Sequence, residues 1–357
     1  MEPELMATRL AQVMTDPDLP IADALARLEE AGTGMLLLAR EDRRLLSVVT
    51  DGDIRRHILA GGRLDEPCHR VANRAPLTGG PDTTPADALA LMNHGREFVV
   101  NQLPLIQPTG ELLQLWLRSD LVSAEPVALS AVIMAGGYGT RLRPLTDDMP
   151  KPMLPVGDRP LLERTVRRLR EAGIQDVRVT THYLGDRIAS HFGDGKAFGV
   201  DITYLNEDRP LGTAGALALV NRPAGPLLVM NGDILTNLNF HALLAFHREH
   251  RADATVAVRK YDLTVPYGVV ECEGTQVKAL QEKPTERFLV NAGIYLLEPT
   301  VLGCIPPGER FDMTELIQVL LQQGRTVVSF PIVEYWLDIG RAEDYERAQS
   351  DVETVRL

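Results

Sequence analysis

Hydrophobic side chains alternate between helical and strand periods along the first part of the chain. In PIADALARLEEAG the apolar positions keep the i, i+3, i+4, i+7 spacing of an amphipathic helix, namely Ile21, Ala24, Leu25 and Leu28. Gly32 is a typical residue for ending such a helix. The next stretch, GMLLLAREDRRLLSVVTDGDIRRHIL, predicts a strand, a polar turn, a second strand and a helix opened by Asp51 or Asp53.

The same order of elements is predicted a second time. TPADALALMNHG has the pattern of a short helix, and REFVVNQLPLIQPTGELLQLWLRSDLV follows it with two strands and a turn. SVVTDGDI in the first copy corresponds to QLWLRSDL in the second, so that Asp53 matches Asp120 while Thr50 matches Leu117. This correspondence indicates an internal duplication with a degraded second copy.

The segment VVTDGDIRR, with the repeat around it, resembles a tandem pair of CBS domains over roughly residues 5 to 124. The resemblance implies an α+β regulatory module that binds adenine nucleotide between its copies, with Thr50 and Asp53 contacting ribose hydroxyls and Asp120 at the matching position of the second copy. A carboxylate accepts protons well from two neighbouring hydroxyls. The alternative is that Thr50 and Asp53 only cap the following helix.

From Ala131 onward, apolar strands alternate with longer helical segments. The stretches AVIMAGG, PLLERTVRRLREAG, DVRVTTHY and PLLVMNGD predict a mostly parallel α/β sheet, in which ligands bind beyond the carboxyl ends of the strands. The Pro-containing segment SAEPVALS interrupts the pattern just before. We therefore predict one unit over residues 1–124, a linker over 125–130 and a second unit over 131–357.

Composition narrows the functional classes. The chain has 357 residues, 45% of them hydrophobic and 24% charged, with a net charge of -12, which is typical of a globular protein and argues against a broad nucleic-acid surface. The longest apolar runs, such as Met35 to Ala39, are too short to cross a bilayer, and the acidic start MEPELMATRL is unlike a secretion signal, so we expect a cytoplasmic location. The spacing of Cys68, Cys272 and Cys304 indicates neither a zinc site nor a disulfide framework.

One glycine-rich, basic stretch stands out, AGGYGTRLRPLTDDMPKPM, which directly follows the first strand of the second half. It is not a Walker A motif, since no Gly-Lys-Ser/Thr is present, and Leu142 occupies the third glycine position of a dinucleotide fingerprint. Its glycines still let backbone N–H groups approach phosphate oxygens. Arg141 supplies a planar fork for phosphate and Lys151 a mobile positive charge, so the stretch predicts a site for a phosphorylated ligand.

Two carboxylates follow strand-like segments farther along the chain. Asp233 lies in MNGD and Asp338 in YWLDIG. Two carboxylates at strand ends can hold Mg²⁺, the ion that commonly bridges phosphates. The alternatives are an Asn-Gly-Asp turn at Asp233 and a helix cap at Asp338.

Taken together, AGGYGTRLRPLTDDMPKPMLPV, LGTAGA, YGVVE, EKP, NAGIYLL and the two aspartate motifs resemble the sugar-1-phosphate nucleotidyltransferases, over residues 129 to 350. The resemblance implies a Rossmann-like, GT-A-like, mostly parallel α/β sheet behind the α+β tandem CBS module. It also implies Mg²⁺-dependent attack of a sugar 1-phosphate on the α-phosphorus of a nucleoside triphosphate, with pyrophosphate leaving, and a homo-oligomer.

The resemblance assigns roles residue by residue. The catalytic cations are Arg141, Lys151 and Lys283. The nucleotide-binding residues are Gly136, Gly137, Gly139, Thr140, Glu207, Gly212 and Thr213. Sugar-binding residues are Gly268, Glu282 and Asn291, and the metal ligands are Asp233 and Asp338. The family often has Thr at the position of Arg341, whose role stays open.

One segment bears on which nucleotide base and which sugar the expected substrates contain. NEDRPLGTAGAL is most similar to the guanylyltransferase branch, and the Glu207 carboxylate can accept from guanine N1–H and its amino group together. This favours GTP, although Glu207 is also compatible with a solvated loop. Mannose 1-phosphate and glucosamine 1-phosphate both stay open, as do a UTP- or dTTP-using enzyme and a non-catalytic nucleotide or sugar-nucleotide sensor.

Overall fold

The computed structural model describes residues 3–93, 100–121, 129–221 and 223–354. The chain forms two compact units, Met1–Val127 with Asn239–Arg251, and Ala128–Leu238 with Ala252–Leu357. The first unit thus includes helix α9 (Phe240–Glu249), which lies within the segment 131–357 in the sequence. Of the predicted linker 125–130, residues 125–128 lie outside the described residues, and Ser130 begins a strand.

The first unit contains the predicted repeat. Its first copy consists of α2 (Ile21–Ala31), β2 (Met35–Ala39), β3 (Leu45–Thr50) and α3 (Asp51–Leu59). Its second copy consists of α4 (Pro85–Asn93), β4 (Gln102–Ile106), β5 (Leu112–Leu117) and α5 (Arg118–Leu121). Helix α1 (Pro3–Val13), the short strand β1 (Met14–Thr15) and the 3-10 turn η1 (Cys68–Arg70) complete the unit. The order helix, strand, strand, helix is therefore confirmed in both copies.

The first unit has two hydrophobic clusters, and the larger one, around the first copy, also includes Leu112 and Leu115 from β5 of the second copy. The strands pair as β1-β2-β3 in one sheet and as β4-β5 in another. The cluster of the first copy includes Ile21, Leu37, Val49 and Ile54. The cluster of the second includes Ala88, Met92, Leu103 and Leu105. These are the apolar positions of the two patterns, buried because each helix places one face on its strands.

A seven-stranded sheet forms the centre of the second unit. Its order is β10-β9-β6-β11-β16-β13-β17. The strands are β6 (Ser130–Met134), β9 (Asp176–Thr181), β10 (Asp201–Asn206), β11 (Leu227–Asn231), β13 (Ala254–Thr264), β16 (Thr285–Leu297) and β17 (Val327–Ile332). Every neighbouring pair is parallel except the two pairs made by β16. The predicted mostly parallel α/β sheet is confirmed.

Helices and small sheets surround this central sheet. The helices are α6 (Leu161–Glu171), α7 (Gly185–Phe192), α8 (Gly212–Gly215), α10 (Met313–Gln322) and α11 (Ala342–Thr354). Three strand pairs lie outside it: β7 (Pro155–Val156) with β8 (Arg159–Pro160), β12 (Ile234–Thr236) with β18 (Trp336–Asp338), and β14 (Val269–Glu273) with β15 (Gln276–Gln281). Within the described ranges, no helix has the length and apolar character needed to cross a membrane.

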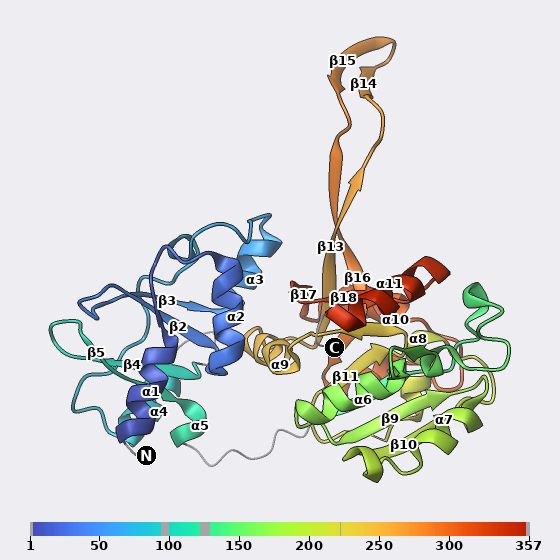
Figure 1. Ribbon diagram of the computed structural model, residues 1–357, viewed down its shortest axis with the longest axis horizontal. Coiled ribbons are helices and arrows are strands. Elements are labelled where there is room, and N and C mark those ends of the chain that lie inside the picture. Colours follow the sequence, from blue (N-terminus) through green and yellow to red (C-terminus); the bar gives the residue numbers. More distant parts are fainter. Residues whose placement is uncertain (1–2, 94–99, 122–128, 222, 355–357) are drawn as a thin grey trace. The chain divides into compact units, whose positions relative to one another are not determined.

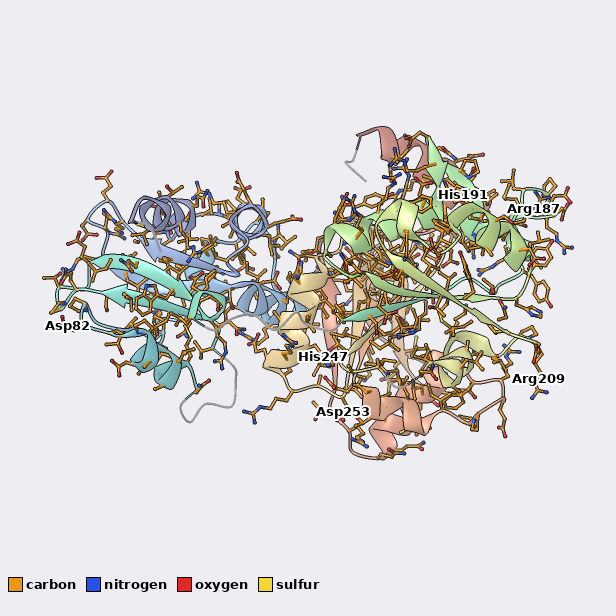
Figure 2. All side chains as sticks on the ribbon, turned by 90° about the horizontal axis from the view of Figure 1, so that it is seen from below. Asp82, Arg187, His191, Arg209, His247 and Asp253 are labelled. Atoms are coloured by element: carbon orange, nitrogen blue, oxygen red, sulfur yellow. The ribbon has the colours of Figure 1, made fainter. Side chains whose placement is uncertain are left out.

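Apolar packing and several polar contacts stabilise the second unit. Val132 and Val229 of the sheet share a cluster with Leu316 of α10. His191 on α7 lies 3.0 Å from a carboxylate oxygen of Glu163 on α6, and Figure 2 labels this histidine above the densely filled sheet region. Such contacts hold the sheet rigid, so the loops that leave its strands have defined positions.

Strands β13 and β16 continue beyond the sheet as a two-stranded ribbon. Residues 260–289, here called the hairpin arm, include the ends of these strands and the β14-β15 pair. Figure 1 shows the arm, in orange, extending away from the sheet with β14 and β15 at its far end. The arm is part of the same compact unit as the sheet.

Candidate active site

The glycine-rich loop leaves the carboxyl end of β6, as predicted, and turns back through the 3-10 turn η2 (Thr140–Leu142). The turn begins at Gly139, whose φ of 63° lies in the left-handed region that favours glycine. Thr146 Oγ1 donates to the Gly139 carbonyl at 2.8 Å and holds the loop closed. At Gly137 an added Cβ would meet no atom within 4 Å, so the middle of the loop faces open space.

Lys151 lies under this loop in the 3-10 turn η3 (Lys151–Met153) and is only 9% exposed. Its ammonium group donates to Asp233 Oδ2, across a sequence separation of 82 residues. The preceding residue, Gly232, packs closely on both neighbouring segments: its N–H donates to the Met134 carbonyl at 2.9 Å, and a Cβ there would lie 2.9 Å from that oxygen and 3.3 Å from Pro152 Cγ, next to Lys151. The structure therefore places the predicted lysine and the first predicted carboxylate in direct contact.

Asp233 and Asp338 lie next to each other on paired strands. In the antiparallel pair β12-β18, Ile234 is opposite Asp338, and the Ile339 N–H donates to the Asp233 carbonyl at 3.0 Å. Asp338 is exposed as a residue, but desolvation raises the pKa of its carboxyl, and the negative charge of Asp233 raises it further, while Lys151 and Arg141 oppose the shift. Of the predicted alternatives, the cap is not made by Asp338, since Asp344 accepts from the Arg341 N–H at 2.9 Å at the start of α11.

The guanidinium of Arg141 lies near Asp338. A Cβ on Gly340 would lie 3.7 Å from Arg141 Nη1 and 3.8 Å from Asp338 Oδ1, so the guanidinium and the carboxylate face the same glycine. Arg141 and Thr140 are both exposed. Within the described residues, Arg141 forms neither a hydrogen bond nor an ion pair with its side chain. The guanidinium is thus available to a ligand.

The two carboxylates have the properties of metal ligands. Asp233 Oδ1 is buried and has no hydrogen-bond partner among the described residues. A buried carboxylate oxygen left without a partner is costly, and a cation between Asp233 and Asp338 would satisfy it. The described part of the chain contains no cluster of three or more His, Cys, Asp or Glu residues suited to a metal. A pair of carboxylates suits Mg²⁺, which usually takes its other ligands from water and phosphate oxygens.

Glu207 lies beside the glycine loop. A Cβ on Gly136 would lie 2.7 Å from Glu207 Oε1, while Glu207 Oε2 accepts from the Leu211 N–H at 2.8 Å. The hydrogen bond from Leu211 orients the carboxylate and connects it to the residue just before α8. One predicted nucleotide-binding carboxylate is thus next to the predicted phosphate loop.

Gly212 and Thr213 have a structural task in addition to their predicted one. Gly212 has a φ of 79°, and a Cβ there would lie 2.8 Å from the Phe311 carbonyl. Thr213 Oγ1 accepts from the Met313 N–H at 2.8 Å, and the Thr213 N–H donates to Asp312 Oδ1 at 3.0 Å. These bonds join α8 to the start of α10, so the side chain of Thr213 is engaged within the protein.

Three aromatic residues next to the loop were missed by the sequence analysis. Tyr138 Oη lies 3.0 Å from His182 Nε2, and His182 Nδ1 lies 2.8 Å from the Glu207 carbonyl. Tyr183 donates to the Asp147 carbonyl at 2.7 Å, and its ring centroid lies 5.4 Å from that of Tyr138. Tyr138 lies in the loop that follows β6, and His182 and Tyr183 directly follow β9. The rule that ligands bind at the carboxyl ends of parallel strands could therefore have identified all three.

The remaining predicted site residues are distributed differently. Asn291 on β16 remains at the edge of the sheet, where its Nδ2 donates to Tyr295 Oη at 2.7 Å and its Oδ1 accepts from the Gly293 N–H at 3.0 Å. Gly268, Glu282 and Lys283 instead lie on the hairpin arm, and all three are exposed. A Cβ on Gly268 would lie 3.1 Å from Glu282 Oε2, so these two residues do face each other.

In the first unit, Thr50 and Asp53 form a reciprocal capping box at the start of α3. Asp53 Oδ2 accepts from Thr50 Oγ1 at 2.7 Å and from the Thr50 N–H at 2.9 Å. Asp120 accepts from the Leu117 N–H at 3.0 Å and from Arg9 Nη1 at 2.5 Å. The capping role that the sequence left open for Thr50 and Asp53 is therefore present in the structure.

Comparison with known proteins agrees with this geometry. Residues 130–355 match the family model described as nucleotidyl transferase, and residues 4–60 match the CBS domain. A mannose-1-phosphate guanylyltransferase of Mycobacterium tuberculosis is 38% identical over 236 residues, which are 63% of this chain and 64% of the relative. This chain thus spans 64% of that relative's length.

Two crystal structures share the fold. HddC from Yersinia pseudotuberculosis, complexed with GMP-PN, is 25% identical with a TM-score of 0.50, and covers 62% of this chain and 99% of its own. A Bacillus anthracis protein assigned as a glucose-1-phosphate thymidylyltransferase, in complex with sucrose, is 26% identical with a TM-score of 0.52, and covers 64% and 97%. With its parallel sheet, its glycine loop and its paired aspartates, the chain belongs to the nucleotidyl transferase family and carries an N-terminal CBS domain.

Proposed function

We propose that the protein transfers a guanylyl group from GTP to a sugar 1-phosphate, giving a GDP-sugar and pyrophosphate. The observation that carries this proposal is the convergence of Lys151, Arg141, Asp233 and Asp338 beside a glycine loop whose centre faces open space. Phosphoryl transfer depends mainly on positioning and on offsetting charge, and this arrangement supplies both.

In the proposed reaction, a phosphate oxygen of the sugar 1-phosphate forms a bond to the α-phosphorus of GTP. The bond from that phosphorus to the bridging oxygen breaks, and pyrophosphate departs with the electron pair. The backbone N–H groups around Gly137 hold the triphosphate. Arg141 offsets the charge of the departing pyrophosphate, and Lys151 donates from its buried position to the oxygens of the phosphoryl group being transferred.

Members of this family generally use a divalent metal ion. We infer Mg²⁺ for this chain, held by Asp233 and Asp338 together with phosphate oxygens, because Asp233 Oδ1 is buried without a partner in the described structure. When bound, the ion would offset charge on the triphosphate and help to orient it. Lys151 would then share the Asp233 carboxylate with the metal or move onto a phosphate oxygen.

Glu207 supports guanine as the base. Its carboxylate lies at the edge of the glycine loop, fixed by the Leu211 N–H, with one oxygen directed toward Gly136. Guanine offers N1–H and an amino group as neighbouring donors, whereas uracil and thymine offer a single N3–H on that side. The relative's name, mannose-1-phosphate guanylyltransferase, and the guanine nucleotide bound by HddC support the same base.

Mannose 1-phosphate is the sugar we favour, because the relative that is 38% identical is named for it. Glucosamine 1-phosphate is the second candidate. One of the similar structures is assigned as a thymidylyltransferase, so dTTP and the related UTP stay as alternative nucleotide substrates. A non-catalytic sensor has less support, since it would have no use for a metal-binding carboxylate pair facing both Lys151 and Arg141.

The test is pyrophosphate release measured with Mg²⁺, crossing GTP, UTP, dTTP, ATP and CTP with the 1-phosphates of mannose, glucosamine, N-acetylglucosamine and glucose. We expect release with GTP and one sugar. Release with UTP or dTTP alone would keep the reaction and overturn the argument from Glu207. No release from folded protein across the whole grid would overturn the enzymatic proposal.

We also propose that residues 1–124 act as a tandem CBS module that binds adenine nucleotide and modulates the transferase. The duplicated fold and the CBS match over residues 4–60 support it. Because Thr50 and Asp53 already bond to each other, a ribose would have to share or replace these bonds. Calorimetry with AMP, ADP and ATP tests binding, and Asp53→Ala should remove any heat if the site is as proposed.

We propose a cytoplasmic location on the basis of the GTP substrate and the free thiols of Cys68, Cys272 and Cys304.

A further inference from the structure

The predicted sugar-phosphate residues and the predicted nucleotide residues lie on different parts of the second unit. Lys151, Asp233 and Asp338 are at the edge of the sheet, whereas Glu282 and Lys283 are on the hairpin arm. Lys283 lies in the short connection between β15 and β16. Figure 1 shows that the hairpin arm extends away from the sheet, with β14 and β15 at its far end. Asn291 is eight positions after Lys283 along the chain, and at about 3.3 Å per residue this extended segment spans roughly 26 Å.

The two groups of residues are chemically complementary. Among the described residues, the side chains of Glu282 and Lys283 make no hydrogen bond or ion pair, and Asp233 Oδ1 and Arg141 are also without such partners. Lys283 has a φ of 46°, a conformation that costs a non-glycine residue energy and is typically retained at functional positions. The hairpin arm and the edge of the sheet therefore both carry charged side-chain atoms without a hydrogen-bond or ion-pair partner among the described residues.

The hairpin arm also exposes an apolar surface. Residues 260–264 and 285–289 are exposed on both faces of the ribbon, and a two-stranded ribbon is at best marginally stable alone in water. Tyr261 pairs directly with Phe288, so these two rings share a face with Leu263, at 53%, 49% and 47% exposure respectively. The neighbouring pair Asp262 and Arg287 forms an ion pair of 3.7 Å on the other face.

The apolar character continues to the end of the arm. Val270 pairs with Leu280, and Tyr267 is 74% exposed beside them. Most of the large hydrophobic side chains that the described residues expose lie on this arm. An exposed apolar patch of this kind marks an interaction surface, and exchange of a hairpin between identical chains is a low-cost route to a dimer.

We propose that the hairpin arm docks on a second copy of this chain and completes that copy's active site, so that Glu282 and Lys283 act in trans on the sugar 1-phosphate. The exchange is reciprocal, since each copy contributes one arm and receives one. Lys283 then pairs with the sugar phosphate next to Asp233 and Asp338 of the other copy, and the apolar face around Tyr261 is covered. This inference rests on the proposed function.

Complementation between two defective chains tests the proposal. Lys283→Ala impairs the arm, Asp233→Asn impairs the sheet edge, and each homodimer should lose at least 100-fold in turnover. A heterodimer of the two, isolated by two affinity tags, contains one intact site if the arms are exchanged, and should recover about half of the wild-type activity. An arm that acts on its own chain leaves this heterodimer inactive, which would overturn the proposal.

A mirror-image control uses the same substitutions. The double variant Lys283→Ala with Asp233→Asn is paired with a wild-type chain. Exchange of arms leaves neither site intact, so this heterodimer should be inactive, whereas an arm acting in cis would leave half of the activity. Wild-type turnover by the Lys283→Ala homodimer would also overturn the proposal.

A readout independent of activity separates this inference from the proposed function. The wild-type chain should be dimeric at micromolar concentration by light scattering, and Tyr261→Ser with Phe288→Ser should shift it to monomer without changing its circular dichroism. A monomeric wild-type protein would overturn the exchange even if it transfers guanylyl groups. An inactive wild-type dimer that these substitutions dissociate would overturn the proposed function and leave the arm contact standing.

Discussion

The ammonium group of Lys151 is hydrogen-bonded to the carboxylate of Asp233, and the second oxygen of that carboxylate is buried without a partner in the described structure. The lysine therefore satisfies only half of the group that it contacts. A metal ion between Asp233 and Asp338 would satisfy the other half, and a phosphate would give the lysine a second acceptor. The contact thus holds two groups of the proposed site in place before any substrate binds.

Arg141 provides a test of catalysis with little effect on folding. Its side chain is exposed and has no hydrogen bond or ion pair in the described structure, so Arg141→Ala should change the free energy of unfolding by no more than about 0.5 kcal/mol. Loss of its charge at the departing pyrophosphate should lower kcat/KM by roughly 10²–10³. Arg143→Ala is the matched control, because Arg143 is 58% exposed and pairs only with Asp147 in the described residues. Equal activities of the two variants would contradict the role of Arg141.

Gly137 and Gly139 should respond differently to alanine. At Gly137 a Cβ meets no protein atom within 4 Å, so Gly137→Ala should unfold at the wild-type temperature but bind the nucleotide more weakly, with KM for GTP raised about tenfold or more. At Gly139 the φ of 63° and a Cβ only 2.9 Å from Thr146 Cγ2 predict strain, at a cost of about 1–3 kcal/mol. Thermal unfolding and GTP titrations of both variants check this. A Gly137→Ala enzyme with unchanged KM would mean that the loop does not hold the triphosphate.

The local patterns predicted the elements better than they predicted the contacts between them. The apolar spacing of PIADALARLEEAG identified α2, and AVIMAGG and PLLVMNGD identified β6 and β11 as strands of a mostly parallel sheet. That these two strands are neighbours was learned from the structure. The Lys151–Asp233 contact depends on how close Gly232 lets two chain segments approach, which no local pattern reports. The same holds for Thr213, whose hydroxyl serves the start of α10 because Asp312 is brought next to it by folding.

The exposed position of Glu282 and Lys283 could not be predicted either. Their motif indicates a ligand site, and their strand pattern is ordinary. Glu282 and Lys283 lie away from the sheet because β13 and β16 are longer than the neighbouring strands and extend beyond them. This is a property of the whole sheet rather than of the motif.

Glu207 is expected to set the choice of base. Glu207→Gln keeps an acceptor for the Leu211 N–H, so the fold should be retained, but the amide no longer offers two acceptor oxygens to guanine. A hydrogen bond to a charged group is worth about 1.5–3 kcal/mol, so kcat/KM for GTP should fall roughly 10- to 100-fold, with a smaller change for UTP and dTTP. Initial rates with each nucleotide measure this. An equal loss for all three would show that Glu207 positions the loop and does not read the base.

The cysteines should differ in reactivity and in its dependence on pH. Burial, and next the negative charge of Asp23, raises the pKa of the Cys68 thiol to about 11, whereas Cys272 on the arm is exposed. The Cys68 thiol therefore loses its proton at a higher pH in the folded protein than in the unfolded chain. Its contribution to the free energy of unfolding is complete below about pH 8.5 and declines as the pH rises toward 11. At pH 8, Ellman's reagent should label Cys272 within minutes and Cys68 only after unfolding. Rapid labelling of Cys68 in the Cys272→Ser protein would contradict the burial.

The most direct test of guanylyl transfer at this site is the initial rate of pyrophosphate release from GTP and mannose 1-phosphate by the wild-type protein and by Asp233→Asn. The amide keeps an oxygen for the Lys151 ammonium group, so the unfolding temperature should stay close to that of the wild type. We expect the wild type to release pyrophosphate and Asp233→Asn to lose roughly 10²–10³ in rate, the size of effect expected when one well-placed electrostatic group is removed. Release by Asp233→Asn at the wild-type rate would show that the paired aspartates do not carry the reaction.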